Sequence, residues 1–240
     1  LVTMFALLLC GLLIREEIWL RNIKNKEINM KQMEQFGDIK LHNCDCMELM
    51  KETPDKYYDL AIVDPPYNLG SKLVNGTWSK KWKEKGAEWD IAPKKEYFEE
   101  LFRVSKNWII WGGNYFIENL PNCRSFISWH KPYMDGMHSM SNVELALTSF
   151  DMNAKSIDFN KDSGVGRIHV CQKPVQLYKW LLQKYAKEGD KILDTHFGSL
   201  SIGIACHDLH FDLTACELDK EYYEAAKKRL IWHQKQLNLF

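Results

Sequence analysis

The tetrapeptide Asp64-Pro65-Pro66-Tyr67 directly follows the apolar run Leu60-Ala61-Ile62-Val63. An apolar run of this length predicts a buried strand, and two consecutive prolines cannot continue it, because proline lacks the N–H that a sheet requires. The chain therefore leaves the sheet as a stiff loop that presents a carboxylate, a proline carbonyl and an aromatic ring. Ligands bind at this carboxyl edge of open α/β sheets. Two acceptors beside a stacking ring suit a flat heterocycle with an exocyclic amine.

Apolar and amphipathic segments alternate along the rest of the chain. Residues 93–107 carry apolar side chains at helical spacing behind a proline near the start, as amphipathic helices do. Strands that alternate with helices predict an α/β fold, with a mainly parallel sheet covered on both faces. Residues 151–168 are expected to form a surface loop. The predicted strands are 39–43, 58–63, 108–111, 126–129, 143–150, 191–195 and 211–217, and the other predicted helices are 45–51, 174–187, 201–208 and 219 onward.

A second motif lies far downstream, at residues 191–203 (KILDTHFGSLSIG). Its pattern indicates a strand that ends in an acidic residue, followed by a glycine-containing turn into a helix. Such a turn brings backbone N–H groups close to a ligand. Glu217 follows the motif by about 20 residues, at the end of the next predicted strand, where dinucleotide-binding folds place the carboxylate that binds ribose hydroxyls.

Together these segments resemble the DNA amino-methyltransferases, which methylate adenine N6 or cytosine N4 with S-adenosylmethionine. The tetrapeptide resembles the family's catalytic motif, residues 194–203 resemble its cofactor motif, and Gln172-Lys173-Pro174 resembles the segment before that motif. A catalytic motif that precedes the cofactor motif is the permuted order of the family's β group. The resemblance covers most of the chain and is closest to short enzymes of phages and mobile elements. It implies a Rossmann-like methyltransferase fold with a seven-stranded sheet.

The resemblance implies that the catalytic residues are Asp64, Pro65, Pro66 and Tyr67. In the family's mechanism the Asp64 carboxylate and the Pro65 carbonyl accept the two amine hydrogens, which localises the nitrogen lone pair and aims it at the methyl group. The target base is flipped out of the duplex and stacks on Tyr67. An aspartate at position 64 resembles the adenine-directed members more than the cytosine-directed ones.

The resemblance also implies S-adenosyl-L-methionine as the cofactor, with Glu217 on its ribose hydroxyls. Asp45 resembles the family's acidic position near the cofactor adenine, although it would serve equally well as a helix cap. The implied cofactor-binding residues are Asp45, Lys173, Asp194, Phe197, Gly198, Ser199 and Glu217.

Two departures from the family pattern leave alternatives open. Leu200 stands where the family usually has its second glycine, and residues 169–171 (HVC) replace the usual His-Pro-Thr. A side chain where the backbone must approach a ligand closely can block that ligand. A degenerate DNA-binding relative without catalysis is therefore an alternative. A cytosine N4 enzyme is a second alternative, and methylation of RNA or protein amides is a third.

The expected partner is double-stranded DNA, contacted by a loop over residues 68–90. Formal net charge is zero, so nucleic-acid contact requires a local basic patch. Lysines interleaved with tryptophans suit phosphate contact and stacking. The alternative is a solvated loop whose tryptophans pack on the core. The proposed DNA-binding residues are Lys72, Trp78, Lys80, Lys81 and Lys83.

At 240 residues, one domain is expected, and the seven cysteines fit a reducing cytoplasm better than a disulfide framework. Residues 1–29 begin with an apolar run and are expected to be a dispensable extension of a domain at 30–240. A packed helix and a membrane anchor are the alternatives. No metal is expected, because His42, Cys44 and Cys46 lack a further set of ligands at a suitable spacing. The β group includes homodimers, so the resemblance leaves a homodimer open.

Overall fold

A nine-stranded sheet forms the centre of the protein, in the order β1-β2-β9-β8-β3-β4-β6-β5-β7. The computed structural model describes residues 33–70, 90–132, 135–136, 141–160, 168–169 and 171–237. The strands are β1 (Met33–Phe36), β2 (Ile39–His42), β3 (Tyr58–Val63), β4 (Ser105–Trp111), β5 (Ser125–His130), β6 (Val143–Thr148), β7 (Lys155–Asp158), β8 (Lys191–Asp194) and β9 (Asp212–Cys216). The helices are α2 (Cys46–Glu52), α4 (Lys95–Val104), α5 (Val175–Tyr185), α6 (Ser201–Leu209) and α7 (Lys220–Leu237), with short 3₁₀ turns η2 (Gly113–Tyr115) and η3 (Ile117–Asn119).

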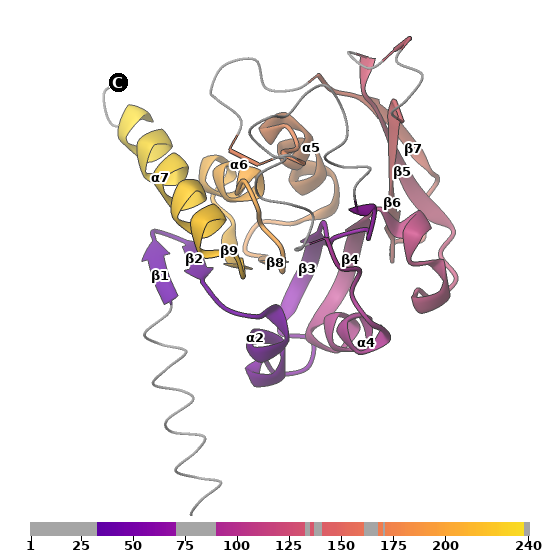
Figure 1. Cartoon of the computed structure of the whole chain (residues 1–240), viewed down its shortest axis with the longest axis horizontal. Coiled ribbons are helices and arrows are strands. Elements are labelled where there is room, and N and C mark those ends of the chain that lie inside the picture. The colour runs from indigo at the N-terminus through magenta and orange to yellow at the C-terminus, as the bar shows by residue number, and fades with distance from the viewer. Residues whose placement is uncertain are drawn as a thin grey trace, which may run out of the picture.

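Helices cover both faces of the sheet (Figure 1). Alternate residues of the central strands enter two separate cores: Leu60 and Ile62 of β3 pack with α5, α6 and α7, whereas Ala61 and Val63 pack with α2 and α4. A strand buried on both faces must be apolar at every position, which explains the continuous run that precedes the tetrapeptide. None of the described helices is long and apolar enough to cross a membrane.

The predicted α/β methyltransferase fold is confirmed, with two more strands than the seven expected. The strands β2, β9, β8, β3 and β4 pair in parallel, while β6 runs antiparallel to β4 and β5. The additional strands are β1, which pairs antiparallel with β2, and β7, which pairs with β5. The expectation of a loop throughout 151–168 was wrong at β7. This edge strand is only four residues long and half-buried, so it carries little hydrophobic pattern.

Most predicted helices are confirmed, with one boundary corrected. The Asp219 carboxylate accepts hydrogen bonds from the backbone N–H groups of Glu221 at 2.8 Å and Tyr222 at 3.0 Å, and so caps α7 as expected. The helix predicted over 93–107 ends earlier, at Val104. The chain turns into β4 there because Ser105 and Asn107 pair with Tyr58 and Leu60 of β3.

Several predicted site residues lie at one edge of the sheet as a result of its parallel centre. Asp64 follows β3, Asp194 ends β8, and Glu217 follows β9. The carboxyl ends of parallel strands meet at the same edge, which is where open α/β sheets bind ligands. The predictions for residues 1–29 and for Lys72, Trp78, Lys80, Lys81 and Lys83 lie outside the described residues.

Candidate active site

Both carboxylate oxygens of Asp64 are engaged by side chains of the protein. The Lys173 ammonium donates to Oδ2, and the Tyr67 hydroxyl donates to Oδ1. Pro65 is buried and Pro66 half-buried, so the double proline holds the loop rigidly between β3 and Tyr67. Burial, and then the neighbouring Asp64 charge, raise the pKa of the Tyr67 hydroxyl well above its ordinary value. Tyr67 is therefore a neutral donor to Asp64 at physiological pH.

The Tyr67 ring is held in place by the segment that follows β4. Gly112 adopts a left-handed conformation with φ +65°, and a Cβ atom there would lie 2.2 Å from a Tyr67 ring carbon. Tyr115 stacks on Tyr67 with ring centroids 4.9 Å apart and planes 15° apart, and 52% of Tyr115 is exposed. The arrangement places a second aromatic ring beside the tetrapeptide of residues 64–67, and only glycine fits at position 112.

Asp90 fixes the chain just after the tetrapeptide. Its buried carboxylate accepts hydrogen bonds from the backbone N–H groups of Tyr67 and Asn68, both at 3.0 Å, and of Gly70 at 2.7 Å. Three N–H donors to one carboxylate give strong charge-assisted hydrogen bonds. The contact joins the two ends of the loop that sequence analysis placed at 68–90. In the sequence, the one signal for Asp90 is its position as the last polar residue of that loop.

A second acidic residue, Glu144 of β6, lies behind Asp64. It accepts from Lys173 at 3.2 Å and, through its other oxygen, from Lys131 at 3.0 Å. Burial opposes ionisation, but Lys173 and Lys131 lower the pKa of Glu144 below its ordinary value. Sequence analysis did not single out Glu144, although a lone acidic residue in the otherwise uncharged strand VELALT is a usable signal.

Lys173 was predicted among the cofactor residues, and the structure brings it to Asp64 and Glu144. Only 3% of its side chain is exposed. Its ammonium also lies 5.2 Å from the centroid of the Trp111 ring. Burial favours the neutral amine, but the Asp64 and Glu144 charges outweigh it and raise the pKa of Lys173 above its ordinary value. Lys173 is therefore a permanent cation at this edge.

Asp194, at the end of β8, is a buried carboxyl in a different situation. Its Oδ1 accepts a hydrogen bond from the His196 backbone N–H at 3.0 Å, and its side chain contacts no lysine or arginine ammonium or guanidinium among the described residues. Burial, together with the charges of Asp64 and Glu217, raises the pKa of Asp194 to about 8. Such a carboxyl favours a positively charged ligand.

Glu217 holds the glycine turn of the cofactor motif. One of its oxygens accepts from the Gly198 N–H at 3.0 Å, and the other accepts from the Asp219 N–H at 2.9 Å. Burial raises the pKa of Glu217 above its ordinary value. The buried Phe197 ring packs against Tyr223, and the Ser199 carbonyl accepts from Arg229 at 2.7 Å. The predicted turn residues are therefore fixed from β9 and α7.

The Leu200 side chain is directed away from the turn. Its backbone is left-handed, with φ 57° and ψ 33°, and the residue is fully buried in the core formed with α5, α6 and α7. A Cβ atom at Gly203 would lie 2.6 Å from Leu200 Cγ, so the glycine one turn into α6 makes room for the leucine. The possible obstruction of a ligand by Leu200 stays a prediction, while the side chain itself is accommodated in the core beside Gly203.

Asp45 is the amino-terminal cap of α2. Its carboxylate is exposed and accepts from the Met47 N–H at 2.8 Å. This is the cap that the sequence offered as the alternative to contact with a cofactor adenine. One oxygen is used by the cap. Desolvation lowers the pKa of the partly buried His196 ring to about 4, and the Asp45 charge opposes this shift.

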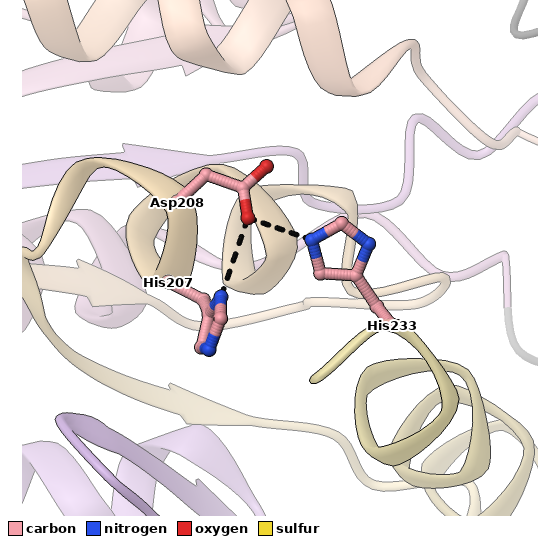
Figure 2. A group of neighbouring side chains, drawn as sticks. All are labelled: His207, Asp208 and His233. Carbon is pink, nitrogen blue, oxygen red and sulfur yellow. Dashed lines mark hydrogen bonds and ion pairs between the residues drawn. The ribbon is translucent and has the colours of Figure 1, made fainter. Parts of the chain in front are cut away.

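A cluster that could hold a metal ion lies outside this edge. The ligand atoms of His207 and Asp208, on α6, and of His233, on α7, lie within 4.8 Å of one another (Figure 2). Asp208 Oδ1 lies 2.6 Å from His233 Nε2 and 3.2 Å from His207 Nδ1. Its other oxygen pairs with Lys179 of α5 at 2.7 Å. Through Asp208 the cluster links α5, α6 and α7.

Comparison with known proteins finds DNA methyltransferases that are similar to this chain. A model of DNA methylases, the N6/N4 group, matches residues 151–228. The type II methyltransferase M.HpaI of Haemophilus parainfluenzae is 26% identical over 245 aligned residues, which cover 80% of this chain and 74% of that protein. The chain is therefore similar to the DNA amino-methyltransferases, and the predicted resemblance to them is confirmed.

Other DNA methyltransferases match over a shorter span or at lower identity. M.BamHI of Bacillus amyloliquefaciens is 28% identical over 130 residues, and the match spans 47% of this chain but only 29% of that protein. Among solved structures, the M1.HpyAVI–SAM complex superposes with a TM-score of 0.57 at 21% identity, covering 80% of this chain and 98% of that one. The cytosine-N4-specific PvuII DNA methyltransferase gives 0.58 at 12% identity, with 80% and 86% covered. These neighbours share the fold.

Proposed function

We propose that this protein transfers a methyl group from S-adenosyl-L-methionine to the exocyclic amine of adenine in double-stranded DNA. The observation that carries the proposal is the position of the Asp64-Pro65-Pro66-Tyr67 loop, at the same sheet edge as Asp194 and Glu217, in a chain similar to the DNA amino-methyltransferases. The order of the two motifs along the chain supports the permuted β group.

The residues of the β8 and β9 ends fit a cationic nucleoside. Asp194 is a buried carboxyl that lacks a cationic partner among the described residues, so the positive charge of such a ligand would compensate it. Glu217 is anchored by two backbone N–H groups and keeps lone pairs for ribose hydroxyls. When bound, S-adenosyl-L-methionine supplies a methyl group on a positively charged sulfur. Asp194, Phe197, Gly198, Ser199 and Glu217 would hold it.

Asp64 and Pro65 then act on the amine of the base. Each accepts one amine hydrogen, so the nitrogen lone pair points at the methyl carbon as the N–C bond forms and the S–C bond breaks, with the S–C electron pair remaining on sulfur. Positive charge develops on nitrogen, and the Asp64 carboxylate stabilises it more in the transition state than in the ground state. The nitrogen finally releases one proton to solvent. Tyr67 aligns the base by stacking, worth about 1 to 3 kcal/mol.

Contact with DNA is proposed for the lysine- and tryptophan-containing loop that leaves from this edge. Asp90 closes its far end onto Tyr67, so the loop begins and ends beside the catalytic tetrapeptide. Replacing Lys80, Lys81 and Lys83 by glutamine should flatten the dependence of DNA affinity on salt, because fewer counterions are released. An unchanged slope would remove the loop from the interface.

The test is methyl transfer from labelled S-adenosyl-L-methionine to unmethylated DNA, with Asp64→Ala as the control. We expect incorporation by the wild type, loss in the variant, and N6-methyladenine after digestion to nucleosides. N4-methylcytosine would support the cytosine alternative. A folded wild-type protein that binds DNA but incorporates no label would support a non-catalytic relative.

A further inference from the structure

Lys173 lies between two carboxylates that come from different parts of the sheet. Asp64 follows β3 at the catalytic edge, and Glu144 belongs to the antiparallel strand β6. The lysine side chain is almost completely buried, so it cannot exchange its partners for water. The Lys131 ammonium, 3.0 Å from the other oxygen of Glu144, holds that carboxylate in place. The four groups form a row of alternating charge with a sum of zero.

The proposed reaction disturbs this row at Asp64. Both Asp64 oxygens already accept hydrogen bonds, from Lys173 and from Tyr67. A carboxylate has about four acceptor positions, so an amine that donates to Asp64 adds to these donors and weakens the attraction between Asp64 and Lys173. A buried ammonium that loses its partner is strongly destabilised, because neither water nor another anion replaces the lost attraction. Lys173 needs a second anion within reach, and Glu144 lies 3.2 Å away.

We propose that Glu144 is a positioning residue that retains the Lys173 ammonium when Asp64 turns to the target amine. Glu144 does not touch the base or the cofactor and acts through Lys173. The transfer of Lys173 from two carboxylates to one keeps every charge paired while Asp64 becomes available. This inference rests on the proposed function, which assigns the amine to Asp64.

The first test does not require methyl transfer. An Asp64→Ala variant imitates the state in which Asp64 has left Lys173, and NMR of side-chain-labelled lysine follows the protonation of Lys173 with pH, assigned through Lys173→Arg. Because Glu144 remains, we expect Lys173 to stay protonated through the accessible alkaline range. Adding Glu144→Gln should lower its titration midpoint by about two pH units or more, as burial does for unpaired lysines. Cys171 and Asp194 also act on this region but are unchanged in both variants.

The second test measures the consequence for catalysis under single-turnover conditions. Glu144→Gln preserves shape but removes the negative charge, so Lys173 stays on Asp64 and the rate should fall by about 10²-fold, as for other misplaced catalytic groups. Affinity for DNA and for S-adenosyl-L-methionine should change less than about threefold, below the tenfold that 1.4 kcal/mol represents. Glu144→Asp, which restores the negative charge, should recover part of the lost rate. A loss that Glu144→Asp does not recover would indicate a purely structural role.

Thr148→Val is the matched control, since Thr148 is buried on the same strand and its hydroxyl has no hydrogen-bond partner among the described residues. It should leave the rate unchanged. Deprotonation of Lys173 in Asp64→Ala alone, or full activity of Glu144→Gln, would overturn the inference. An inactive wild type in which the NMR results hold would instead overturn the proposed function and leave the pairing of Lys173 by Glu144 established.

Discussion

Two carboxyl groups at one edge of the sheet lie in opposite surroundings. Asp64, after β3, is bound by an ammonium and a hydroxyl of the protein itself. Asp194, at the end of the neighbouring strand β8, receives one backbone N–H at 3.0 Å, and burial with nearby negative charge raises its pKa to about 8. The difference indicates separate tasks. In the proposed function, Asp64 is oriented by its two donors to meet a neutral amine, whereas Asp194 favours a ligand that brings positive charge.

The comparison between Asp64 and Asp194 would fail if the Leu200 side chain obstructed the cofactor site beside Asp194. Leu200→Ala should cost about 2 to 5 kcal/mol of unfolding free energy, because it removes a fully buried side chain from the core. Leu200→Gly should cost about 1 kcal/mol less, since glycine relieves the left-handed backbone at φ 57°. Chemical denaturation measures both. Affinity for S-adenosyl-L-methionine should be unchanged. Tighter binding by the glycine variant would show that Leu200 obstructs the cofactor.

Gly112→Ala tests the Asp64 part of the comparison, because it displaces the Tyr67 ring. Its Cβ would lie 2.2 to 2.7 Å from three Tyr67 ring carbons, so the ring must move away from Asp64. We expect single-turnover methyl transfer to fall by about 10²-fold, with affinity for S-adenosyl-L-methionine unaffected. Gly37→Ala is the control, because Gly37 has the same φ of +65° with no atom near its Cβ position. Equal losses in both variants would mean that backbone strain, and not Tyr67, is responsible.

The raised pKa of Asp194 predicts a pH dependence of the free energy of unfolding. Between about pH 4 and pH 8 the native state retains a proton that the unfolded chain has lost, so the free energy of unfolding falls as pH rises through this window. Asp194 contributes up to about 1.4 kcal/mol per pH unit to that fall. Asp194→Asn should remove this contribution, which urea unfolding at several pH values measures. An identical slope in the variant would contradict the assignment.

The same proton is linked to the cofactor. A cationic ligand favours the ionised carboxylate, so binding of S-adenosyl-L-methionine below about pH 8 should release a proton from Asp194 and tighten as pH rises toward that value. Calorimetry in buffers of different ionisation enthalpy measures the released proton. Release that persists in Asp194→Asn would assign it to another group.

Local sequence was sufficient for the features that depend on neighbouring residues. A buried apolar run before two prolines must end its strand there, and Asp219 caps α7 through N–H groups two and three residues away. The shared edge follows from parallel strands, so the positions of Asp64, Asp194 and Glu217 at predicted strand ends were enough to place the three together.

Features that depend on tertiary pairing could not be predicted. Glu144 reaches Lys173 only because β6 runs antiparallel between β4 and β5, a direction that its own residues do not specify. The sequence left open whether Leu200 obstructs the glycine turn, and the space that its side chain occupies beside Gly203 depends on the packing of the core. In both cases a contact with a distant or unexpectedly small residue decides the role of the side chain.

The most direct test compares Asp64→Asn with Glu217→Gln. It measures cofactor binding and methyl transfer separately in each variant. Calorimetry gives the affinity for S-adenosyl-L-methionine, and labelled methyl incorporation into DNA gives the transfer rate. We predict that Asp64→Asn binds the cofactor like the wild type and transfers at least about 10²-fold more slowly, whereas Glu217→Gln binds the cofactor more weakly. Methyl transfer at the wild-type rate by Asp64→Asn, or equal loss of cofactor binding in both variants, would contradict the account.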